Sequence, residues 1–246
     1  VKALRDGGLN ATKLTELPAS IAGLESLEKL DLNQTSELTS LRPQIGGLEK
    51  LKELYLNNHS LTALPQEIGE LEKLRILSLN QSSKEGLTSL PQEIEDLEDL
   101  EKLSLDNNIL TTFPEGIKGL KNLQILTAKN NDITELPKEI GRLLTLKELF
   151  LNDNQLTTLP EEIEKLDNLV TCDLQNNQLE NTSGLGELRK LEILNLNNNK
   201  LADYPFEVTD TITSLKRLDF KKNKVKVFPV EMKEMMALEY LNMDEN

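Results

Sequence analysis

The stretch LKELFLNDNQLTTLPEEIEKLDN, residues 146–168, is one unit of a repeat that occupies this chain of 246 residues. The units follow the pattern LxxLxLxxNxL with some substitutions and usually continue as LxxLPxxIxxLxxL, and successive units start 22 to 26 residues apart. Self-similarity at such a period is typical of repeat architectures. Taking the first leucine of LxxLxL as the start, the units begin at Leu4, Leu27, Leu51, Leu74, Leu100, Leu123, Leu146, Leu169, Leu191, Leu215 and Leu238.

The two halves of the unit predict different local structures. LxL has the spacing of a short strand with one buried face, and IxxLxxL has helical spacing. One unit cannot bury its apolar face alone, whereas stacked units share a continuous core. We therefore predict an α/β solenoid of about ten to eleven repeats, a right-handed arc with a parallel β-sheet on its concave side and short helical or 3-10 returns on its convex side. It forms a single domain over residues 1–246, more divergent in 1–99 and regular in 100–246.

The asparagine of LxxN predicts a structural ladder inside this arc. A buried asparagine can bond the backbone groups of adjacent turns, which would otherwise be unpaired. The first four units have Thr12, Thr35, His59 and Ser82 at this position. The remaining units have an asparagine there, namely Asn108, Asn131, Asn154, Asn177, Asn199, Asn223 and Asn246.

Composition excludes several functional classes. Lys and Arg total 28 against 42 Asp and Glu, so the formal charge is −14, which argues against binding to nucleic acid or anionic membrane. No apolar run approaches the roughly 18 residues of a membrane span. A single cysteine excludes an intramolecular disulfide. The chain starts at Val1 without a basic segment followed by an apolar one, so we expect that a signal peptide is absent or already removed.

The residues with catalytic or metal-binding chemistry are better explained as structure. His59 is the only histidine, and its ring would replace the amide of the asparagine position. Cys172 stands where other units have a strand leucine, so it is predicted to be a small buried apolar residue. Their units lie about 24 Å apart at roughly 4.8 Å per strand, too far for a nucleophilic pair. The acidic run of residues 93–103 lacks a calcium-loop pattern and predicts a solvated face, with adventitious cation binding left open. We assign no catalytic residue, cofactor or metal.

Side chains that flank the middle leucine of a strand must face outward, because neighbours on a strand point to opposite sides. Tyr55, Ile76, Ile125 and Phe150 take such positions over a span of about 19 Å. An apolar centre with a polar rim is typical of a protein-binding patch, although these residue types also favour strands. The predicted partner-binding residues are Tyr55, Ile76, Lys102, Ile125, Phe150, Asp173 and Ile193. Asparagines after the strands are expected to add polar contacts, namely Asn57, Asn80, Asn152 and Asn197.

Two further segments are candidates for contacts. The segment LKRLDFKKNKVKV, residues 215–227, is basic in an acidic chain. Its residues Arg217, Lys221, Lys222 and Lys224 could receive an acidic protein surface or a sulfated glycan, or could serve solubility alone. Residues 82–86 add three residues to the regular unit, and we expect them to bulge from one rim as a contact loop or a passive bulge.

The units resemble the leucine-rich repeat family, in its 23-residue LPxxIxxL class. In particular, LPKEIGRL at 136–143 and LPEEIEKL at 159–166 are similar to the leucine-rich repeat proteins of Leptospira. This resemblance implies an exported or surface-associated bacterial protein, linked to virulence, that binds host or cell-surface proteins. Relatives of the class also act as intracellular scaffolds, so a cytoplasmic location is the alternative.

These observations predict a non-enzymatic module that binds a protein partner on its concave face, without cofactor, nucleic acid or membrane span. The alternative is an intracellular scaffold or a structural unit that assembles through its ends. Solenoids need polar caps, and we find none in the sequence, with Leu241 and Met243 near an open edge. We therefore expect either a piece of a longer protein or end-to-end association into a homo-oligomer.

Overall fold

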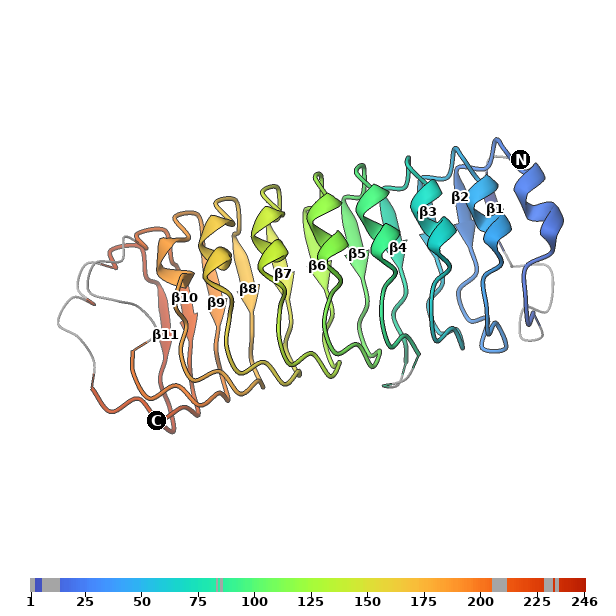
Figure 1. Ribbon diagram of the computed structural model, residues 1–246. Helices are drawn as coiled ribbons and strands as arrows, with labels where there is room; N and C mark the ends of the chain where they lie inside the picture. Colours follow the sequence, from blue (N-terminus) through green and yellow to red (C-terminus); the bar gives the residue numbers. More distant parts are fainter. Residues whose placement is uncertain are drawn as a thin grey trace.

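The computed structural model describes residues 3–5, 14–82, 84, 86–204, 212–227, 232 and 235–246 (Figure 1). Its described residues form one sheet of eleven parallel strands in sequence order, with the two ends of the chain at opposite ends of the stack. The strands are β1 (Ala3–Arg5), β2 (Lys29–Asp31), β3 (Glu53–Tyr55), β4 (Ile76–Ser78), β5 (Lys102–Ser104), β6 (Ile125–Thr127), β7 (Glu148–Phe150), β8 (Thr171–Asp173), β9 (Ile193–Asn195), β10 (Arg217–Asp219) and β11 (Tyr240–Asn242).

Short 3-10 helices return the chain behind the sheet. They are η2 (Ala19–Gly23), η3 (Pro43–Gly47), η4 (Gln66–Glu70), η5 (Gln92–Asp96), η6 (Glu115–Gly119), η7 (Lys138–Arg142), η8 (Glu161–Lys165) and η9 (Leu185–Glu187). A proline in extended conformation precedes most of them, as Pro160 precedes η8, and its carbonyl accepts the N–H of Ile163 at 3.0 Å. Proline suits this place because it has no N–H to leave unpaired. Ile163 then points into the core and is fully buried.

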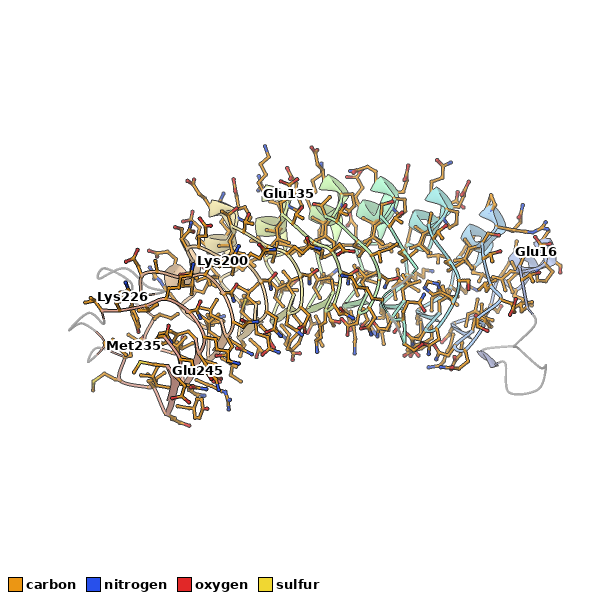
Figure 2. All side chains as sticks on the ribbon, turned by 90° about the horizontal axis from the view of Figure 1, so that it is seen from below. Glu16, Glu135, Lys200, Lys226, Met235 and Glu245 are labelled. Atoms are coloured by element: carbon orange, nitrogen blue, oxygen red, sulfur yellow. The ribbon has the colours of Figure 1, made fainter. Side chains whose placement is uncertain are left out.

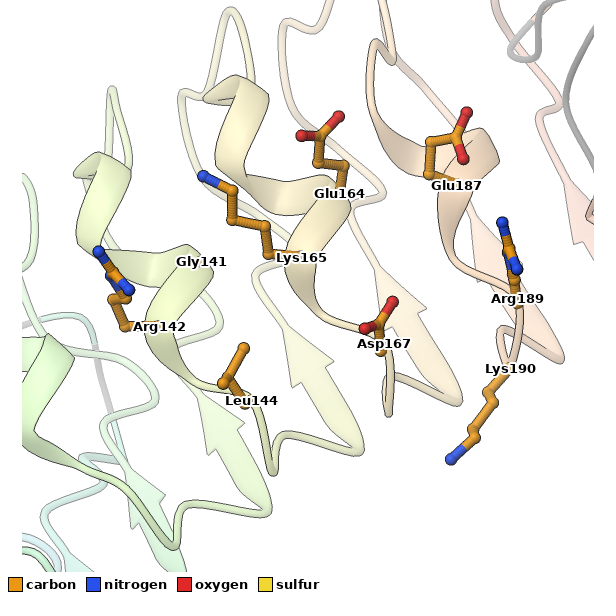
Figure 3. Close-up of a pocket in the computed structure, with 9 residues that line it drawn as sticks. All are labelled: Gly141, Arg142, Leu144, Glu164, Lys165, Asp167, Glu187, Arg189 and Lys190. Carbon is orange, nitrogen blue, oxygen red and sulfur yellow. The ribbon is translucent and has the colours of Figure 1, made fainter.

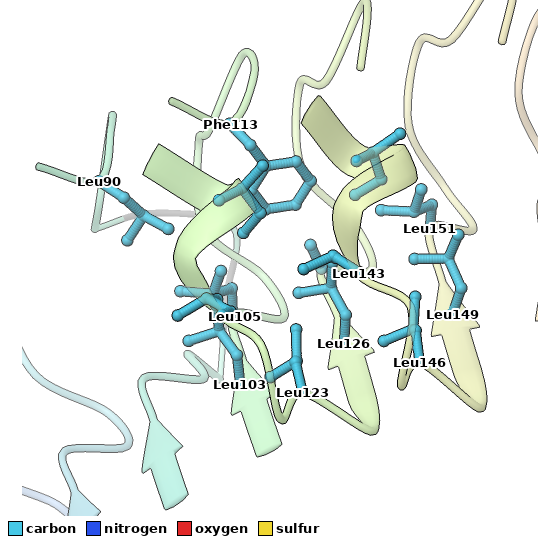
Figure 4. Packing of buried hydrophobic residues seen from close by; sticks show 14 of the residues in the cluster. Leu90, Leu103, Leu105, Phe113, Leu123, Leu126, Leu143, Leu146, Leu149 and Leu151 are labelled. Carbon is cyan, nitrogen blue, oxygen red and sulfur yellow. The ribbon is translucent and has the colours of Figure 1, made fainter. Parts of the chain in front are cut away.

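Leucine packing joins the two layers. The middle residues of neighbouring strands stack in register, as Leu103, Leu126 and Leu149 do (Figure 4), and all three are fully buried. Figure 2 shows the resulting arc, with the 3-10 helices along its outer side and the strands along its inner side. The predicted solenoid with a concave parallel sheet is therefore confirmed. Within the described residues no helix has the length and apolar character needed to cross a bilayer.

The predicted register of the first unit is wrong. Leu4 pairs with Leu30, the middle leucine of its strand, and not with Leu27. The register positions on either side of Leu4 belong to Ala3 and Arg5. The physical reason is that the predicted register would place Gly7, which has no side chain, at the inward position. Thr12, the predicted ladder residue of this unit, lies outside the described residues.

The asparagines of the repeat tie each unit to the one before it. Asn154 donates from Nδ2 to the carbonyl of Ala128 in the preceding unit at 2.9 Å and to its own Leu151 at 3.0 Å. Its Oδ1 accepts the N–H of Ile133 at 3.0 Å. Equivalent bonds are made by Asn108, Asn131, Asn177, Asn199 and Asn223. We call this series the inner ladder.

The chain turns sharply beside the inner ladder. Most of these turns hold a residue in the left-handed region, which asparagine tolerates better than other residues with a side chain. The described non-glycine residues with positive φ are Gln34, Asn58, Asn107, Asn130, Asp153, Asn176, Asn198, Lys222 and Glu245. Some of these side chains also stack on one another, since Asn130 donates to Asn107 at 2.8 Å and Asn198 to Asn176 at 2.9 Å.

The inner ladder changes composition towards the N-terminal end. His59 is buried, and its Nδ1 accepts the N–H of Leu61 at 2.9 Å. Ser82 was the predicted ladder residue of the next unit, but it is exposed, and Gln81 is buried instead. Gln81 donates from Nε2 to the backbone carbonyl of His59 at 2.9 Å. The longer side chain at position 81 reaches the position that serine cannot fill, in the unit that carries the insertion.

The end of this insertion requires glycine. Gly86 has φ +100°, and a Cβ there would lie 2.7 Å from Gln81 Nε2 and 2.8 Å from Asn108 Oδ1. Lys84 within the insertion pairs with Asp132 two units further on, at 2.8 Å. Ser83 and Glu85 lie outside the described residues. The described part of the insertion is thus tied to the regular units beside it.

Replacing Asn154 with alanine tests the inner ladder. The change leaves the Ala128 carbonyl and the Ile133 N–H without their partner, while the Leu151 carbonyl keeps its bond from Asn177. We therefore expect the free energy of unfolding to fall by about 2–4 kcal/mol. Urea denaturation measures it, and Thr158→Ala, at an exposed position of the same unit, is the control. A loss for Asn154→Ala as small as that of the control would show that the amide is dispensable.

The stability of the chain should depend on pH through His59. Burial lowers the pKa of His59 from 6.5 to about 4, although a bond to the Leu79 backbone offsets part of the effect. The unfolded state then binds more protons between these two values, so the stabilisation is complete above pH 6.5 and is lost as the pH falls towards 4. The full effect is about 3 kcal/mol.

Urea denaturation of the native chain and of His59→Asn at pH 7, about 6 and about 5 measures this effect. Carboxylates contribute equally to both chains, and asparagine restores the usual ladder residue. We expect the native chain alone to lose about 2 kcal/mol between pH 7 and 5 through this group. Parallel pH profiles would show that His59 titrates normally in the folded chain.

Candidate functional site

The sheet register sorts the outward side chains of the concave face into two rows. The first row holds the first residue of each strand and the second row holds the third. From β3 to β9 the first row reads Glu53, Ile76, Lys102, Ile125, Glu148, Thr171 and Ile193. The second row reads Tyr55, Ser78, Ser104, Thr127, Phe150, Asp173 and Asn195.

The predicted partner-binding residues all lie in these rows, but their apolar members do not form one patch. Lys102 stands directly between Ile76 and Ile125 in the first row. Tyr55 and Phe150 stand at opposite ends of a run of three small, buried residues in the second row, namely Ser78, Ser104 and Thr127. The apolar members of the predicted patch are therefore separated by polar side chains, and their role in partner binding stays a prediction. Ile193 is 40% exposed and lies further along the first row.

Each outward ring on the concave face carries a cation. Lys129 Nζ lies 4.5 Å from the centroid of the Phe150 ring, and Lys29 Nζ lies 4.3 Å from that of Tyr55. The guanidinium carbon of Arg217 lies 4.2 Å from the centroid of Tyr240. A cation over an aromatic face is attracted by the ring quadrupole. The rings are therefore not bare hydrocarbon, which explains how a chain in water can hold them outward.

We call an outward ring, together with the cation over it and the neighbouring carboxylate, a ring unit. The first ring unit centres on Tyr55. Its hydroxyl donates to Glu53 Oε2 at 3.2 Å, and Glu53 also pairs with Lys29 of the preceding strand. The bond from Lys29 lowers the pKa of Glu53 and in turn raises the pKa of Lys29. Burial raises the pKa of the Tyr55 hydroxyl. At neutral pH the unit is thus a neutral phenol held by an ion pair.

The second ring unit centres on Phe150. Asp173 is its neighbour in the second row, and Asp173 Oδ1 accepts the N–H of Gln175 at 3.1 Å. Burial raises the pKa of Asp173, while this bond, a side-chain bond from Asn195 and the nearby Lys129 lower it in part. Sequence reasoning missed Lys129 and Lys29. Lys129 follows its strand by two residues and reaches the ring of the next unit, so the available signal was a lysine one unit before an outward ring.

The asparagines expected to offer polar contacts are mostly engaged within the sheet. Asn57 Oδ1 accepts the backbone N–H of Asn80 at 2.8 Å, and Asn80 Oδ1 accepts that of Asp106 at 2.7 Å. Asn197 Oδ1 accepts the N–H of Lys221 at 2.7 Å. We call this series the outer ladder. It fixes the edge of the concave surface rather than leaving these amides free.

Acidic partners accompany most of the predicted basic patch. Lys221 and Lys222 approach Glu245 at 3.1 and 3.8 Å, and Arg217 pairs with Asp219 at 2.7 Å. The contact with Glu245 raises the pKa of Lys221 and lowers that of Glu245. Lys224 is exposed. Because three of these four cations are paired, the patch is less positive than its sequence indicates.

The two residues with potential nucleophilic chemistry are far apart and internal. Cys172 is fully buried and pairs in register with Leu149 and Leu194, as a strand leucine would. Burial raises the pKa of its thiol, which disfavours the reactive thiolate. His59 belongs to the unit of β3, five strands away from β8. Within the described residues no group of three His, Cys, Asp or Glu could hold a metal ion.

The outer side carries a hollow of about 810 Å³ beside η7, η8 and η9 (Figure 3). Its lining consists mainly of charged side chains of both signs, with Leu144 as its exposed apolar residue. Small-molecule sites are mostly apolar with a few placed polar groups. This hollow is therefore a solvated groove between neighbouring units and not a pocket of that kind. The lining residues are Gly141, Arg142, Leu144, Glu164, Lys165, Asp167, Glu187, Arg189 and Lys190.

Comparison with known proteins gives two matches to family models. A model of a leucine-rich repeat region matches residues 2–103 and 43–134, and a model of a single leucine-rich repeat matches residues 145–166. The matched residues extend over more than half of the chain. A comparison with curated protein sequences finds no match.

Solved structures with the same architecture include a leucine-rich repeat protein of Leptospira interrogans, with 36% identity and a TM-score of 0.79 over 94% of this chain. The PEPR1–AtPEP1 structure shares 26% identity over 94% of this chain with a TM-score of 0.78. The TLR13–ssRNA13 complex shares 26% over 93% with a TM-score of 0.65. This chain spans 64% of the Leptospira protein and 33% and 37% of the other two.

Proposed function

This chain belongs to the leucine-rich repeat family, and we propose that it is a module that binds a protein partner on its concave sheet. The fold of the family is commonly a protein–protein interaction scaffold and is typically non-catalytic. The similar structure of PEPR1 was solved together with AtPEP1, which supports a binding role for such an arc. Another similar structure holds single-stranded RNA. The charge of −14 favours a protein partner over RNA for the present chain.

The observation that carries the proposal is the pair of ring units in the second row. Tyr55 and Phe150 lie four strands apart, about 19 Å, with a low floor of small side chains between them. A cation over each ring holds these positions before any partner arrives, and the outer ladder adds to this beside Tyr55. Aromatic anchors with few rotatable bonds cost little ordering entropy on binding. Tyr55 and Phe150 are therefore the proposed anchors.

The proposed setting is the bacterial cell surface or the secreted fraction, with a host or cell-surface protein as the partner. The 36% identity to a Leptospira interrogans protein and the LPxxIxxL repeats support this setting. An intracellular scaffold and an end-to-end assembly are the alternatives. Partner capture and the mass in solution separate them, because only the assembly predicts a concentration-dependent increase in mass.

Affinity capture from a host-cell surface extract tests the proposal. We compare the native chain with a Tyr55→Asp, Phe150→Asp double variant. Each anchor of an interface typically contributes about 2 kcal/mol or more to the binding free energy. We therefore expect the affinity of the double variant for the partner to fall by more than about a hundredfold. Thermal unfolding of both chains verifies that the double variant remains folded.

Leu144→Ser is the matched control, since it removes an exposed apolar side chain from the outer side. It should retain the partner fully. If the folded double variant captured the same proteins as the native chain, the concave face would not be the binding surface. The Arg217 region and the ends of the stack would then be examined in its place.

A further inference from the structure

Asn152, just after β7, has a buried polar atom without a partner. The residue is 8% exposed, and its Nδ2 donates to Asp153 Oδ2 at 2.6 Å. Among the described residues, Asn152 Oδ1 is the buried side-chain oxygen that accepts no hydrogen bond. Such an atom is costly, because it loses its bonds to water and gains nothing in return. Its presence on the edge of the concave face requires an explanation.

The outer ladder shows which donor belongs there. At the equivalent position of other units, Asn57, Asn80 and Asn197 each accept the backbone N–H of the next unit. The corresponding N–H for Asn152 is that of Gln175, but it donates to Asp173 Oδ1 at 3.1 Å. Asn152 and Asp173 thus present two acceptors to the Gln175 N–H, and Asp173 also accepts a side-chain bond from Asn195. Either acceptor can hold the Gln175 N–H and leave the other for a different partner.

The surroundings of Asp173 favour a cation. Asp173 pairs in register with Phe150, and the carboxylate of Asp153 lies near enough to affect its charge. Glu148 lies on the same strand as Phe150. Lys129, whose Nζ lies over the ring, is the cation present, and it forms no ion pair within the described residues. The ammonium of Lys129 thus lies over the ring and near the Asp173 carboxylate, and Asp153 adds negative charge to the surroundings of Asp173.

We propose that Phe150 and Asp173 form a subsite for an arginine side chain of the protein partner, an inference that rests on the proposed concave-face function. The guanidinium stacks on the Phe150 ring in place of Lys129 and donates to the Asp173 carboxylate. The Gln175 N–H then passes from Asp173 to Asn152 Oδ1. Binding leaves no backbone donor unpaired and provides the unpartnered oxygen with a donor.

Arginine fits this subsite better than lysine. Its guanidinium is planar, stacks on aromatic faces and offers two parallel N–H groups to one carboxylate. It is also less strongly hydrated than the ammonium of Lys129, so it loses less on leaving water. The resident lysine shows that the ring face accepts a cation, and the flanking carboxylates favour the better-fitting one.

NMR titration of the ¹⁵N-labelled chain with acetyl-Gly-Arg-Gly-amide tests the subsite without the partner. We expect saturable shifts of the Gln175 amide, because its hydrogen-bond acceptor changes. The same peptide with lysine should bind at least about threefold more weakly. A citrulline peptide, which keeps the shape and lacks the charge, should give no saturable shift.

Variants of the chain locate the contact. Asp173→Asn should lower the affinity for the arginine peptide by about tenfold or more, since it removes a charge-assisted bond. Lys129→Met keeps the stem and removes the competing charge, so it should tighten binding several-fold. Asp31→Asn is the matched control, because Asp31 holds the same row position six strands away and accepts the N–H of Asn33 at 3.3 Å. It should leave the Gln175 titration unchanged.

Several results would overturn the subsite. They are an absence of saturable shifts at Gln175 in the native chain, equal binding of the citrulline peptide, or equal losses for Asp173→Asn and Asp31→Asn. Weaker binding by Lys129→Met would show that the peptide does not take the ring face. A failed titration leaves the concave-face function open to the capture experiment. Conversely, a positive titration with failed capture would retain the subsite and reject the proposed function.

Discussion

Pairing of backbone groups inside the stack is the constraint on which this structure depends. Each unit turns its chain through the interior between strand and return, where N–H and C=O groups meet no water. The inner ladder supplies the missing partners, and each amide, such as that of Asn154, bonds both its own unit and the preceding one. Leucine burial drives the units together, but it is not directional. The amides set how far apart and in which register the units stand.

The concave surface inherits this regularity. Because the strands pair in register, outward side chains form straight rows, and a residue in one unit has fixed neighbours in the next. The outer ladder holds the edge of those rows in the same manner. Side-chain contacts on this face therefore form between neighbouring units, such as those of Lys129 with Phe150 and of Lys29 with Tyr55. At Asn152, where the outer ladder is interrupted, a ring and a partly buried carboxylate lie side by side in the second row.

Much of this fold can be predicted from the sequence, because a repeat states the same local rule many times. The inward and outward positions of the strands follow from LxL alone, and the proline and isoleucine of each return follow from LPxxI. Prediction fails in units whose sequence departs from the repeat. The glycines after Leu4 misplace the first register, and the lengthened fourth unit gives the ladder position to Gln81 rather than Ser82. The cations over Tyr55 and Phe150 were missed, although each is a lysine one unit before its ring, because long side chains cross between units and strand alternation does not fix their direction.

The inner ladder also determines how such a chain can change in length. Removing residues 146–168 would bring the amide of Asn177 opposite the backbone groups that Asn154 now bonds, and every interior partner would be found again. A shorter deletion would offset each amide from its partners along the rest of the stack. Duplication and loss of whole units are therefore compatible with the architecture, while partial insertions must be placed at a rim, as at residues 82–86. Such a solenoid can gain, lose or exchange whole units, and with them its outward side chains, while the contacts in its interior stay the same.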